Sequence, residues 1–333
     1  MIKLINTDAA RTKNMIPKLL GAAALSIAFF TAFTGTASAQ DLADVEVNSY
    51  HVQGNIWVLT GAGGHVTVQI GDQGVLVVDT QFAETAPKIV EEIRRLAPGK
   101  IIRYVINTHA HGDHTGGNQI VRAAGETIVA GNEAGDVGET FEPGAEVIAH
   151  ENVMLSMATA NPPLPFEAWP TEVYIGNKYD FYFNGEPVEL LYQGRAHTNG
   201  DSIIFFRKSD VIAAGDIYVT EGFPFIDQNN FGHINGIIDG LNQIISITVP
   251  QDQQEGGTMV ISSHGRLSDE ADVVEYRDML TIIRDRVQYL IDEGMSLEEV
   301  LEVGPARDYS NRYGNGFIST DDFITAVYNN LSE

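Results

Sequence analysis

Three histidines and one aspartate lie within six residues of this chain, and no other feature constrains its fold as strongly. His109, His111, Asp113 and His114 follow the apolar run 101–108 directly. His109 and His111 are two residues apart, so on an extended backbone their side chains project to the same side. The glycine that follows them lets the chain bend before the second pair. Neutral imidazoles and a carboxylate are ligands that suit Zn²⁺ and similar ions. The spacing therefore predicts a metal site at the end of a buried strand.

The first 39 residues have the pattern of a secretory signal peptide. Basic residues precede an uncharged, mostly apolar stretch over 19–32, which is short for a membrane span. Residues 37–39 read Ala-Ser-Ala and provide a cleavage site, so Gln40 is the expected first residue of the mature chain. The pattern predicts a periplasmic or secreted protein, and a membrane anchor that stays attached is the alternative. After cleavage no membrane contact is expected, because no later apolar stretch is long enough for a transmembrane helix.

The mature chain would be strongly acidic. Removal of residues 1–39 takes away four basic residues and one acidic residue, which leaves 16 basic against 44 acidic residues and a net charge of −28. Such a surface repels nucleic acid and anionic lipid, so a small molecule is the expected partner. No oligomeric state is predicted. Because the chain has no cysteine, it has no disulfide, no thiolate nucleophile and no cysteine metal ligand. Any metal site must be built from histidines and carboxylates.

Short β-branched runs between turns, alternating with amphipathic stretches, predict a mixed α/β fold. Strands are expected at 55–60, 65–70, 74–79, 101–108, 126–130, 178–183, 188–192, 202–206, 211–214 and 258–263. Helices are expected at 85–96, 119–123, 234–247, 269–292 and 320–331, with a capping box at 296–299. A strand, a helix and a second strand that ends in polar residues form an α/β arrangement whose site lies at the edge of the sheet.

Residues 151–179 interrupt this pattern. The segment 161–170 is too rich in proline for regular structure, and it carries Phe166 and Trp169. A long aromatic loop in a compact domain is often a lid or a binding loop, and this predicts that both side chains lie near a substrate pocket. The alternative is that the aromatic side chains simply pack on the body of the domain.

Three more candidate ligands lie after strands or in the links between strands. His197 lies in the glycine-rich link 194–201, Asp216 follows the run 211–214, and His264 follows the run 258–263. Together with the run 101–108, three apolar strands thus deliver a histidine or an aspartate at their C-terminal ends. Residues near Asp216 are further candidates for lining a substrate pocket, namely Tyr218, Phe223 and His233.

Together these residues resemble the metallo-β-lactamase superfamily. The His-x-His-x-Asp-His order and the later His197, Asp216 and His264 match that family in order and spacing over nearly all of residues 50–265. The resemblance implies an αββα sandwich with a dinuclear metal site, usually zinc, at its edge. It assigns one metal to His109, His111 and His197 and the other to Asp113, His114 and His264. It also implies that Asp216 bridges the two metals and that Asp79 orients ligands without binding metal.

The resemblance implies hydrolysis of a small acyl compound, such as an ester, a thioester, a lactone or a β-lactam. A hydroxide that bridges two zinc ions would attack, and Asp113 or a water molecule would manage the proton; iron or manganese are the alternative metals. The expected domains are a signal peptide at 1–39, a catalytic domain at 40–267 and a helical C-terminal extension at 268–333 that packs on the body.

Within the superfamily, the missing cysteine excludes the β-lactamases with a cysteine ligand, and the bridging Asp216 resembles glyoxalase II and lactonases. Two rival functions stay open. One is a dioxygenase that acts on persulfides with a single iron. The second ligand set, Asp113, His114 and His264, argues against it, because a single iron would not need it. The other is a zinc-binding protein without catalysis.

Overall fold

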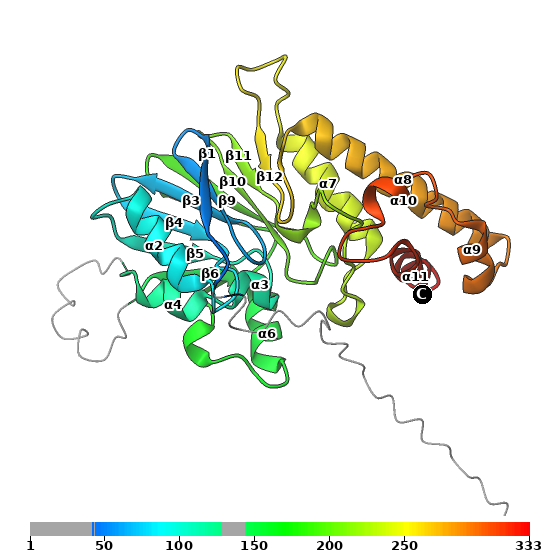
Figure 1. Ribbon diagram of the computed structural model, residues 1–333, viewed down its shortest axis with the longest axis horizontal. Coiled ribbons are helices and arrows are strands. Elements are labelled where there is room, and N and C mark those ends of the chain that lie inside the picture. The colour runs from blue at the N-terminus through cyan, green and yellow to red at the C-terminus, as the bar shows by residue number, and fades with distance from the viewer. Residues whose placement is uncertain (1–41, 43, 128–143) are drawn as a thin grey trace, which may run out of the picture. The chain divides into compact units, whose positions relative to one another are not determined.

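The computed structural model describes residues 42, 44–127 and 144–333, and in them two β-sheets face each other with helices on both outer faces (Figure 1). The apolar residues explain this layering, because they form three large clusters. One lies between the sheets, one between the first sheet and its helices, and one between the second sheet and its helices. The expected αββα sandwich is confirmed. The signal peptide and its cleavage site lie outside the described residues.

The first sheet contains seven strands that lie side by side in the order of the chain. They are β1 (Asn48–Gln53), β2 (Ile56–Thr60), β3 (Val66–Gly71), β4 (Gly74–Val78), β5 (Ile102–Ile106), β6 (Glu146–His150) and β7 (Glu172–Tyr174). The first four form an antiparallel meander, and β4 to β7 run parallel. Because parallel strands end at the same edge of a sheet, the residues that follow β4 and β5 meet there.

The second sheet contains six strands. Their order is β13 (Leu267–Ser268), β12 (Met259–Ile261), β11 (Val211–Ala213), β10 (Ser202–Phe206), β9 (Glu186–Tyr192) and β8 (Lys178–Phe183). β11 and β12 run parallel, and the other neighbouring pairs are antiparallel. The chain therefore leaves β11 and β12 at one edge, which places Asp216 and His264 near each other.

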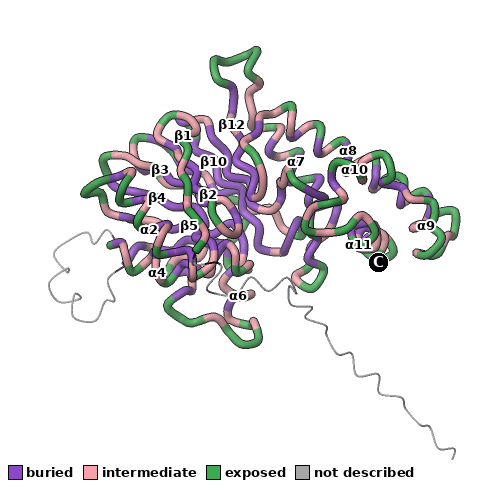
Figure 2. The backbone as a smooth tube through the Cα atoms, in the orientation of Figure 1, coloured by how far each residue is buried: buried purple, intermediate pink, exposed green. Residues whose placement is uncertain are grey.

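Helices cover the outer face of each sheet. α2 (Ala86–Leu96) and α4 (Asn118–Ala123) pack on the first sheet, and α7 (Ile234–Ile247) and α8 (Glu270–Asp292) pack on the second (Figure 1). The chain then continues through α9 (Leu297–Val303), α10 (Ser310–Tyr313) and α11 (Thr320–Leu331). Figure 2 shows that burial is concentrated in the strands, whereas the helices expose their outer sides. In the part of the chain that is described, no helix has both the length and the apolar character needed to cross a membrane.

The helices after residue 268 share an apolar cluster with the second sheet. Leu280 of α8 and Phe323 of α11 belong to the same buried cluster as Ile203 of β10 and Ile237 of α7. The predicted capping box at the start of α9 is present, because the Ser296 side chain accepts from the Glu299 amide and the Glu299 side chain accepts from the Ser296 amide. These helices are thus continuous with the core of the sandwich.

The structure differs from the sequence predictions in several short elements. The strands β1, β6, β7 and β13 were not expected, and each is short or lies towards a sheet edge. Of the strand expected at 126–130, residues 126 and 127 are not in a strand, and the rest lies outside the described residues.

The segment 151–179, where the sequence pattern breaks, begins with a helix that was not predicted, α6 (Glu151–Thr159). Its first turn is capped by the His150 ring, which accepts from the amide of Asn152. Val153 and Met157 are its buried residues, and they pack on Ala168 in the short 3₁₀ helix η1 (Phe166–Ala168). With so few buried positions, α6 has a weak apolar stripe, which is why the sequence did not reveal it.

Candidate metal centre

The ends of three strands and one link bring the predicted ligands together. The chain leaves β5 and reaches His109 and His111, and then turns into the short helix α3 (Gly112–Thr115), which carries Asp113 and His114. Asp216 lies in the 3₁₀ helix η2 (Gly215–Ile217) after β11, His264 follows β12, and His197 lies between β9 and β10. The seven side chains form two adjacent groups, and within each group the candidate ligand atoms lie within 4.8 Å of one another.

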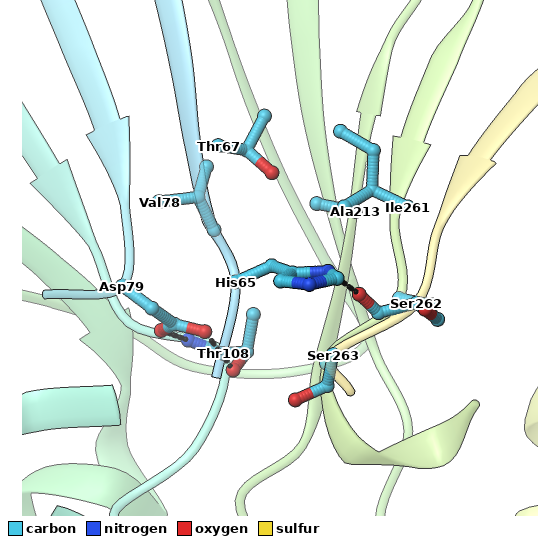
Figure 3. A pocket seen from close by; sticks show the side chains of 11 residues that line it. His65, Thr67, Val78, Asp79, Thr108, Ala213, Ile261, Ser262 and Ser263 are labelled. Atoms are coloured by element: carbon cyan, nitrogen blue, oxygen red, sulfur yellow. Dashed lines mark hydrogen bonds between the residues drawn. The ribbon is translucent and has the colours of Figure 1, made fainter. Parts of the chain in front are cut away.

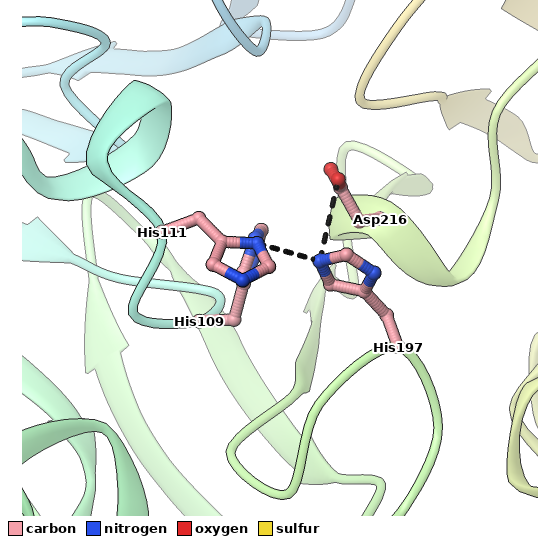
Figure 4. A group of neighbouring side chains, drawn as sticks. All are labelled: His109, His111, His197 and Asp216. Carbon is pink, nitrogen blue, oxygen red and sulfur yellow. Dashed lines mark hydrogen bonds and ion pairs between the residues drawn. The ribbon is translucent and has the colours of Figure 1, made fainter. Parts of the chain in front are cut away.

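The first group consists of His109, His111, His197 and Asp216. Figure 4 shows the four side chains pointing towards one another from three separate segments. Nδ1 of His111 lies 3.2 Å from Nε2 of His109 and 2.8 Å from Nε2 of His197. Nε2 of His197 is also 3.5 Å from Oδ2 of Asp216. Three ring nitrogens and a carboxylate oxygen therefore converge on one point.

In two of these rings, the nitrogen that faces away from the centre of the group makes a hydrogen bond. These bonds fix which nitrogen faces the centre. Nδ1 of His197 donates to the carbonyl oxygen of Phe225 at 2.7 Å, and Nε2 of His111 donates to Oδ2 of Asp227 at 2.8 Å. Because each neutral imidazole then carries its proton on the far nitrogen, the near nitrogen presents a lone pair. This is the usual way in which a protein orients a histidine for metal binding.

Asp79 supports one histidine of each group. Its Oδ2 accepts from Nδ1 of His114 at 2.8 Å and from the Thr108 hydroxyl at 2.7 Å. The same hydroxyl oxygen lies 3.1 Å from Nδ1 of His109, which completes a chain from one group to the other. Asp79 is buried and has a positive φ of 62°, an uncommon conformation for a residue with a side chain. The structure thus places Asp79 where the sequence comparison expected a ligand-orienting carboxylate.

The second group consists of Asp113, His114 and His264, and Asp216 faces both groups. Oδ2 of Asp113 lies 3.6 Å from Nε2 of His114 and 3.4 Å from Nε2 of His264. Oδ1 of Asp216 lies 3.2 Å from Nε2 of His114, whereas its Oδ2 is the oxygen near His197. Asp216 therefore directs one oxygen towards each group, as the implied bridging role requires.

The electrostatics of the cluster favour a positive charge at its centre. Burial lowers the pKa of His197 to about 4 and the pKa of His109 well below its usual value, so both rings are neutral at pH 7. Burial opposes the charged form of His114 as well, but Asp113, Asp216 and Asp79 outweigh it and hold the pKa of His114 well above its usual value. Carboxylates that favour a proton on a buried histidine also favour a metal cation at the same place.

The donor set fits metal ions. Oδ1 of Asp216 is buried and makes no hydrogen bond among the described residues, although Nε2 of His114 lies 3.2 Å away, and a cation between them would satisfy both atoms. The lone pairs of His109, His111 and His197 would likewise repel one another without a cation between them. Imidazole nitrogens and carboxylate oxygens are the ligands that zinc and similar divalent ions accept. Both groups can therefore hold metal.

A glycine and a small cavity complete the surroundings of the cluster. A Cβ on Gly64 would lie 2.3 Å from Cε1 of His114, so no larger residue fits at this position. Below the cluster, a cavity of about 10 Å³ lies between the sheets and is lined by His65, Asp79, Thr108 and neighbouring residues (Figure 3). It is far smaller than the ~300 Å³ of a typical ligand pocket. The open side of the cluster, from which a substrate could approach, is where the side chains of His111, Asp113 and His264 are partly exposed.

Three of the predicted pocket residues have structural roles instead. Tyr218 is buried and its hydroxyl donates to Ser268, and the buried Phe223 stacks on Phe323 at 4.6 Å between ring centroids. The His233 ring caps α7 by accepting from the amide of Asn235, and Nε2 donates to the carbonyl oxygen of residue 330. The prediction that these three line a pocket is corrected, because the C-terminal helices cover this side of the chain.

The two predicted aromatic residues of the loop 161–170 differ from each other. Trp169 packs against the buried cluster around α6, against which Ala110 of the histidine motif also packs, and its indole N–H donates to the carbonyl oxygen of Leu164 at 3.0 Å. Phe166 is exposed, with its ring 5.5 Å from that of Trp169. Packing of the aromatic side chain on the body, the alternative to a lid, thus describes Trp169.

Sequence reasoning missed the acceptors that orient the rings. Asp227 and the carbonyl oxygen of Phe225 hold His111 and His197, and Thr108 links His109 to Asp79. The position of Thr108 directly before His109 is the signal that could have identified it. Asp227 lies in an irregular segment among 44 other acidic residues, so nothing in the sequence distinguished it.

With this geometry in place, comparison with known proteins identifies the family. The model of the metallo-β-lactamase superfamily matches residues 52–264, which is more than half of the chain and ends at the last candidate ligand. The chain belongs to the metallo-β-lactamase superfamily. Members of this superfamily such as β-lactamases and sulfatases are hydrolases, and the fold typically binds metal ions.

Among curated proteins, the chain is similar to the 2,4-dinitroanisole O-demethylase subunit alpha of Nocardioides sp. (strain JS1661). The two are 26% identical over 176 residues, which are 51% of this chain and 45% of that protein. The chain thus matches less than half of the length of this relative.

Two solved structures share the fold at low sequence identity. The inverting sec-alkylsulfatase Pisa1 from Pseudomonas sp. is 14% identical with a TM-score of 0.63, over 85% of this chain and 50% of that one. A metallo-β-lactamase from Pontibacter korlensis is also 14% identical, with a TM-score of 0.53, over 71% of this chain and 99% of that one. The match to the sulfatase extends over more of this chain but spans only half of the sulfatase.

Proposed function

We propose that this protein is an exported hydrolase that uses two zinc ions to cleave a small acyl compound, namely an ester, a thioester, a lactone or a β-lactam. The observation that carries the proposal is the orientation of Asp216, which directs one carboxylate oxygen towards each of two complete ligand groups. A single iron, as in a persulfide dioxygenase, would leave Asp113, His114 and His264 without a purpose. Export rests on the pattern of residues 1–39.

The residues of the chain have separate tasks in this reaction. Two divalent cations, when bound, supply a water nucleophile of lowered pKa and polarise the carbonyl group. Asp216 holds the two ligand groups in register, while Asp79 and Asp227 keep the histidine rings in place. Asp113 is partly exposed and lies 3.4 Å from His264, so its carboxylate is placed to accept a proton on the open side of the cluster.

A second candidate follows from the relatives. The names of the demethylase and the sulfatase describe the cleavage of an aryl methyl ether and of alkyl sulfate esters. The same cluster would serve either reaction, since in both a water molecule cleaves a bond to oxygen. A panel of carboxylic esters, thioesters, lactones, β-lactams, aryl ethers and sulfate esters on zinc-loaded protein decides between the two.

The bridging role is tested with Asp216→Ala. We expect the substitution to lower kcat/KM by about a thousandfold or more, because the geometry that places the nucleophile is lost, and to lower the metal content. Asp239→Ala is the matched control, since Asp239 is an exposed carboxylate on α7. If Asp216→Ala keeps two metals and a turnover near that of the parent, Asp216 is not the bridge.

A further inference from the structure

A partly exposed aromatic side chain lies beside two histidines of the first ligand group. Phe225 is 39% exposed, although its neighbours Phe223 and Ile226 are buried. Its ring centroid lies 5.8 Å from that of His197 and 6.1 Å from that of His111. The backbone of Phe225 already serves the site, because its carbonyl oxygen orients His197. The exposed side chain is not needed for that role.

A second aromatic side chain reaches the same place from the C-terminal part of the chain. Phe317 lies between α10 and α11, is 64% exposed, and meets the ring of Phe225 edge to face, with 5.7 Å between centroids. The backbone next to Phe317 lies close to the segment that carries Phe225, because a Cβ on Gly316 would lie 2.7 Å from Cα of Gly222. The amide of Phe223 also donates to the carbonyl oxygen of Tyr313 at 3.2 Å.

Exposure of two adjacent aromatic rings to water is unfavourable, whereas similar rings a few residues away in the sequence are buried. Phe223 and Phe323 stack in the core. Among the described residues, Asp113, Asp216 and Asp227 form ion pairs with histidines and with no lysine or arginine, so no cationic side chain beside them could bind a charged substrate group. The recognisable feature beside the cluster is therefore apolar surface.

We propose that Phe225 and Phe317 form an aromatic wall that binds an apolar group of the substrate, and best an aryl group, next to the bond that is cleaved. This proposal rests on the proposed function, because the group that the wall binds belongs to the substrate of that reaction. An aryl group would contact both rings at the edge-to-face and offset geometries that aromatic side chains favour. The C-terminal helices thus contribute to specificity through Phe317.

The test compares ligands that differ only in the apolar group. Phenylacetyl and acetyl thioesters of the same thiol measure turnover, and benzohydroxamate and acetohydroxamate measure binding to zinc-loaded protein by calorimetry. We expect the parent to prefer the aryl member of each pair, and Phe317→Ala and Phe225→Ala to reduce that preference by about fivefold to tenfold. Zinc content should stay at the parental value. The control is Tyr182→Ala, because Tyr182 is 67% exposed on the outer strand β8 of the second sheet.

The two arms separate the wall from the reaction. If the thioesters are not cleaved but the preference for benzohydroxamate depends on Phe225 and Phe317, hydrolysis of thioesters is wrong and the wall is supported. If both hydroxamates bind the parent equally or not at all, the wall is overturned. It is also overturned if the aryl preference survives both substitutions or falls equally in Tyr182→Ala.

Discussion

Four histidines of the candidate metal centre have a hydrogen-bond partner at the ring nitrogen that faces away from the cluster. Asp79 supports His114, and Asp227 supports His111, although neither carboxylate is a candidate ligand itself. In both cases the acceptor fixes the tautomer and the ring orientation before any metal binds. The affinity of the site for metal should therefore respond to residues that never touch it.

Asp227→Ala tests this dependence. We expect zinc affinity or turnover to fall by about 10- to 100-fold, since the His111 ring loses its acceptor. The measurement is a competition titration with a zinc chelator, together with kcat/KM. Asp227 also accepts from the amides of Asn229 and Asn230, so the folded state of the variant is checked by circular dichroism. Parental zinc affinity in a folded variant would show that the acceptor is unimportant.

The candidate ligands and the supporting carboxylate of Asp79 could be predicted from sequence, whereas Asp227 and the carbonyl oxygen of Phe225 could not. His109, His111, Asp113 and His114 lie in one short segment, so their spacing alone indicates a metal site. Asp227 is brought to His111 by the path of a segment 116 residues later, and no local pattern encodes that approach. Proximity in sequence was also misleading, because His233 follows the Asp216 segment but caps a helix.

At the scale of elements, the edge where strands end is what assembles the site. β5, β11 and β12 each deliver a ligand at the same edge, and this could be read from apolar runs that end in histidine or aspartate. α6 and the edge strands were missed because they bury few side chains. The sequence predicted that the last helices pack on the body, but not which face they cover, since that depends on which apolar faces meet.

The start of α7 joins the last helix through His233. Its Nδ1 accepts from the Asn235 amide and its Nε2 donates to the carbonyl oxygen of Asn330, so the ring must be neutral. Burial lowers the pKa of His233 from its usual value; Arg195 also lowers it, whereas the contact with Asn330 and the charge of Glu333 raise it. The unfolded chain therefore binds a proton more readily, and this contribution to stability is present above about pH 6.5 and is lost as the pH falls below it.

His233→Asn should remove this dependence. Asparagine caps a helix but does not titrate in this range. We expect Tm to fall less between pH 7.5 and pH 5 in the variant than in the parent, as measured by differential scanning calorimetry. His51→Asn, which replaces an exposed histidine of β1, should keep the parental slope. Equal slopes for parent and His233→Asn would contradict the role assigned to His233.

At the scale of the whole molecule, the sandwich and the C-terminal helices share one apolar cluster. Residues of β10, α7, α8 and α11 belong to it. Such a shared core predicts that they unfold together, with residues 268–333 as an extension that packs on the body.

Unfolding by denaturant tests this cooperativity. The chain has two tryptophans, Trp57 in β2 and Trp169 near α6, so fluorescence reports on the first sheet and its surroundings, whereas circular dichroism reports mainly on the helices. We expect the two transitions of zinc-loaded protein to share one midpoint. A helical transition at lower denaturant would show that the C-terminal helices unfold separately.

The central claim is that the cluster holds two metal ions and that both are needed for hydrolysis. The most direct test is a zinc titration of protein that has been stripped of metal. After dialysis, bound zinc is measured by elemental analysis, and turnover is measured on the same samples. The account predicts two zinc ions per chain and a turnover that reaches its plateau only near the second equivalent, because Asp216 joins two complete ligand groups. Saturation of binding and turnover at one ion per chain would contradict it.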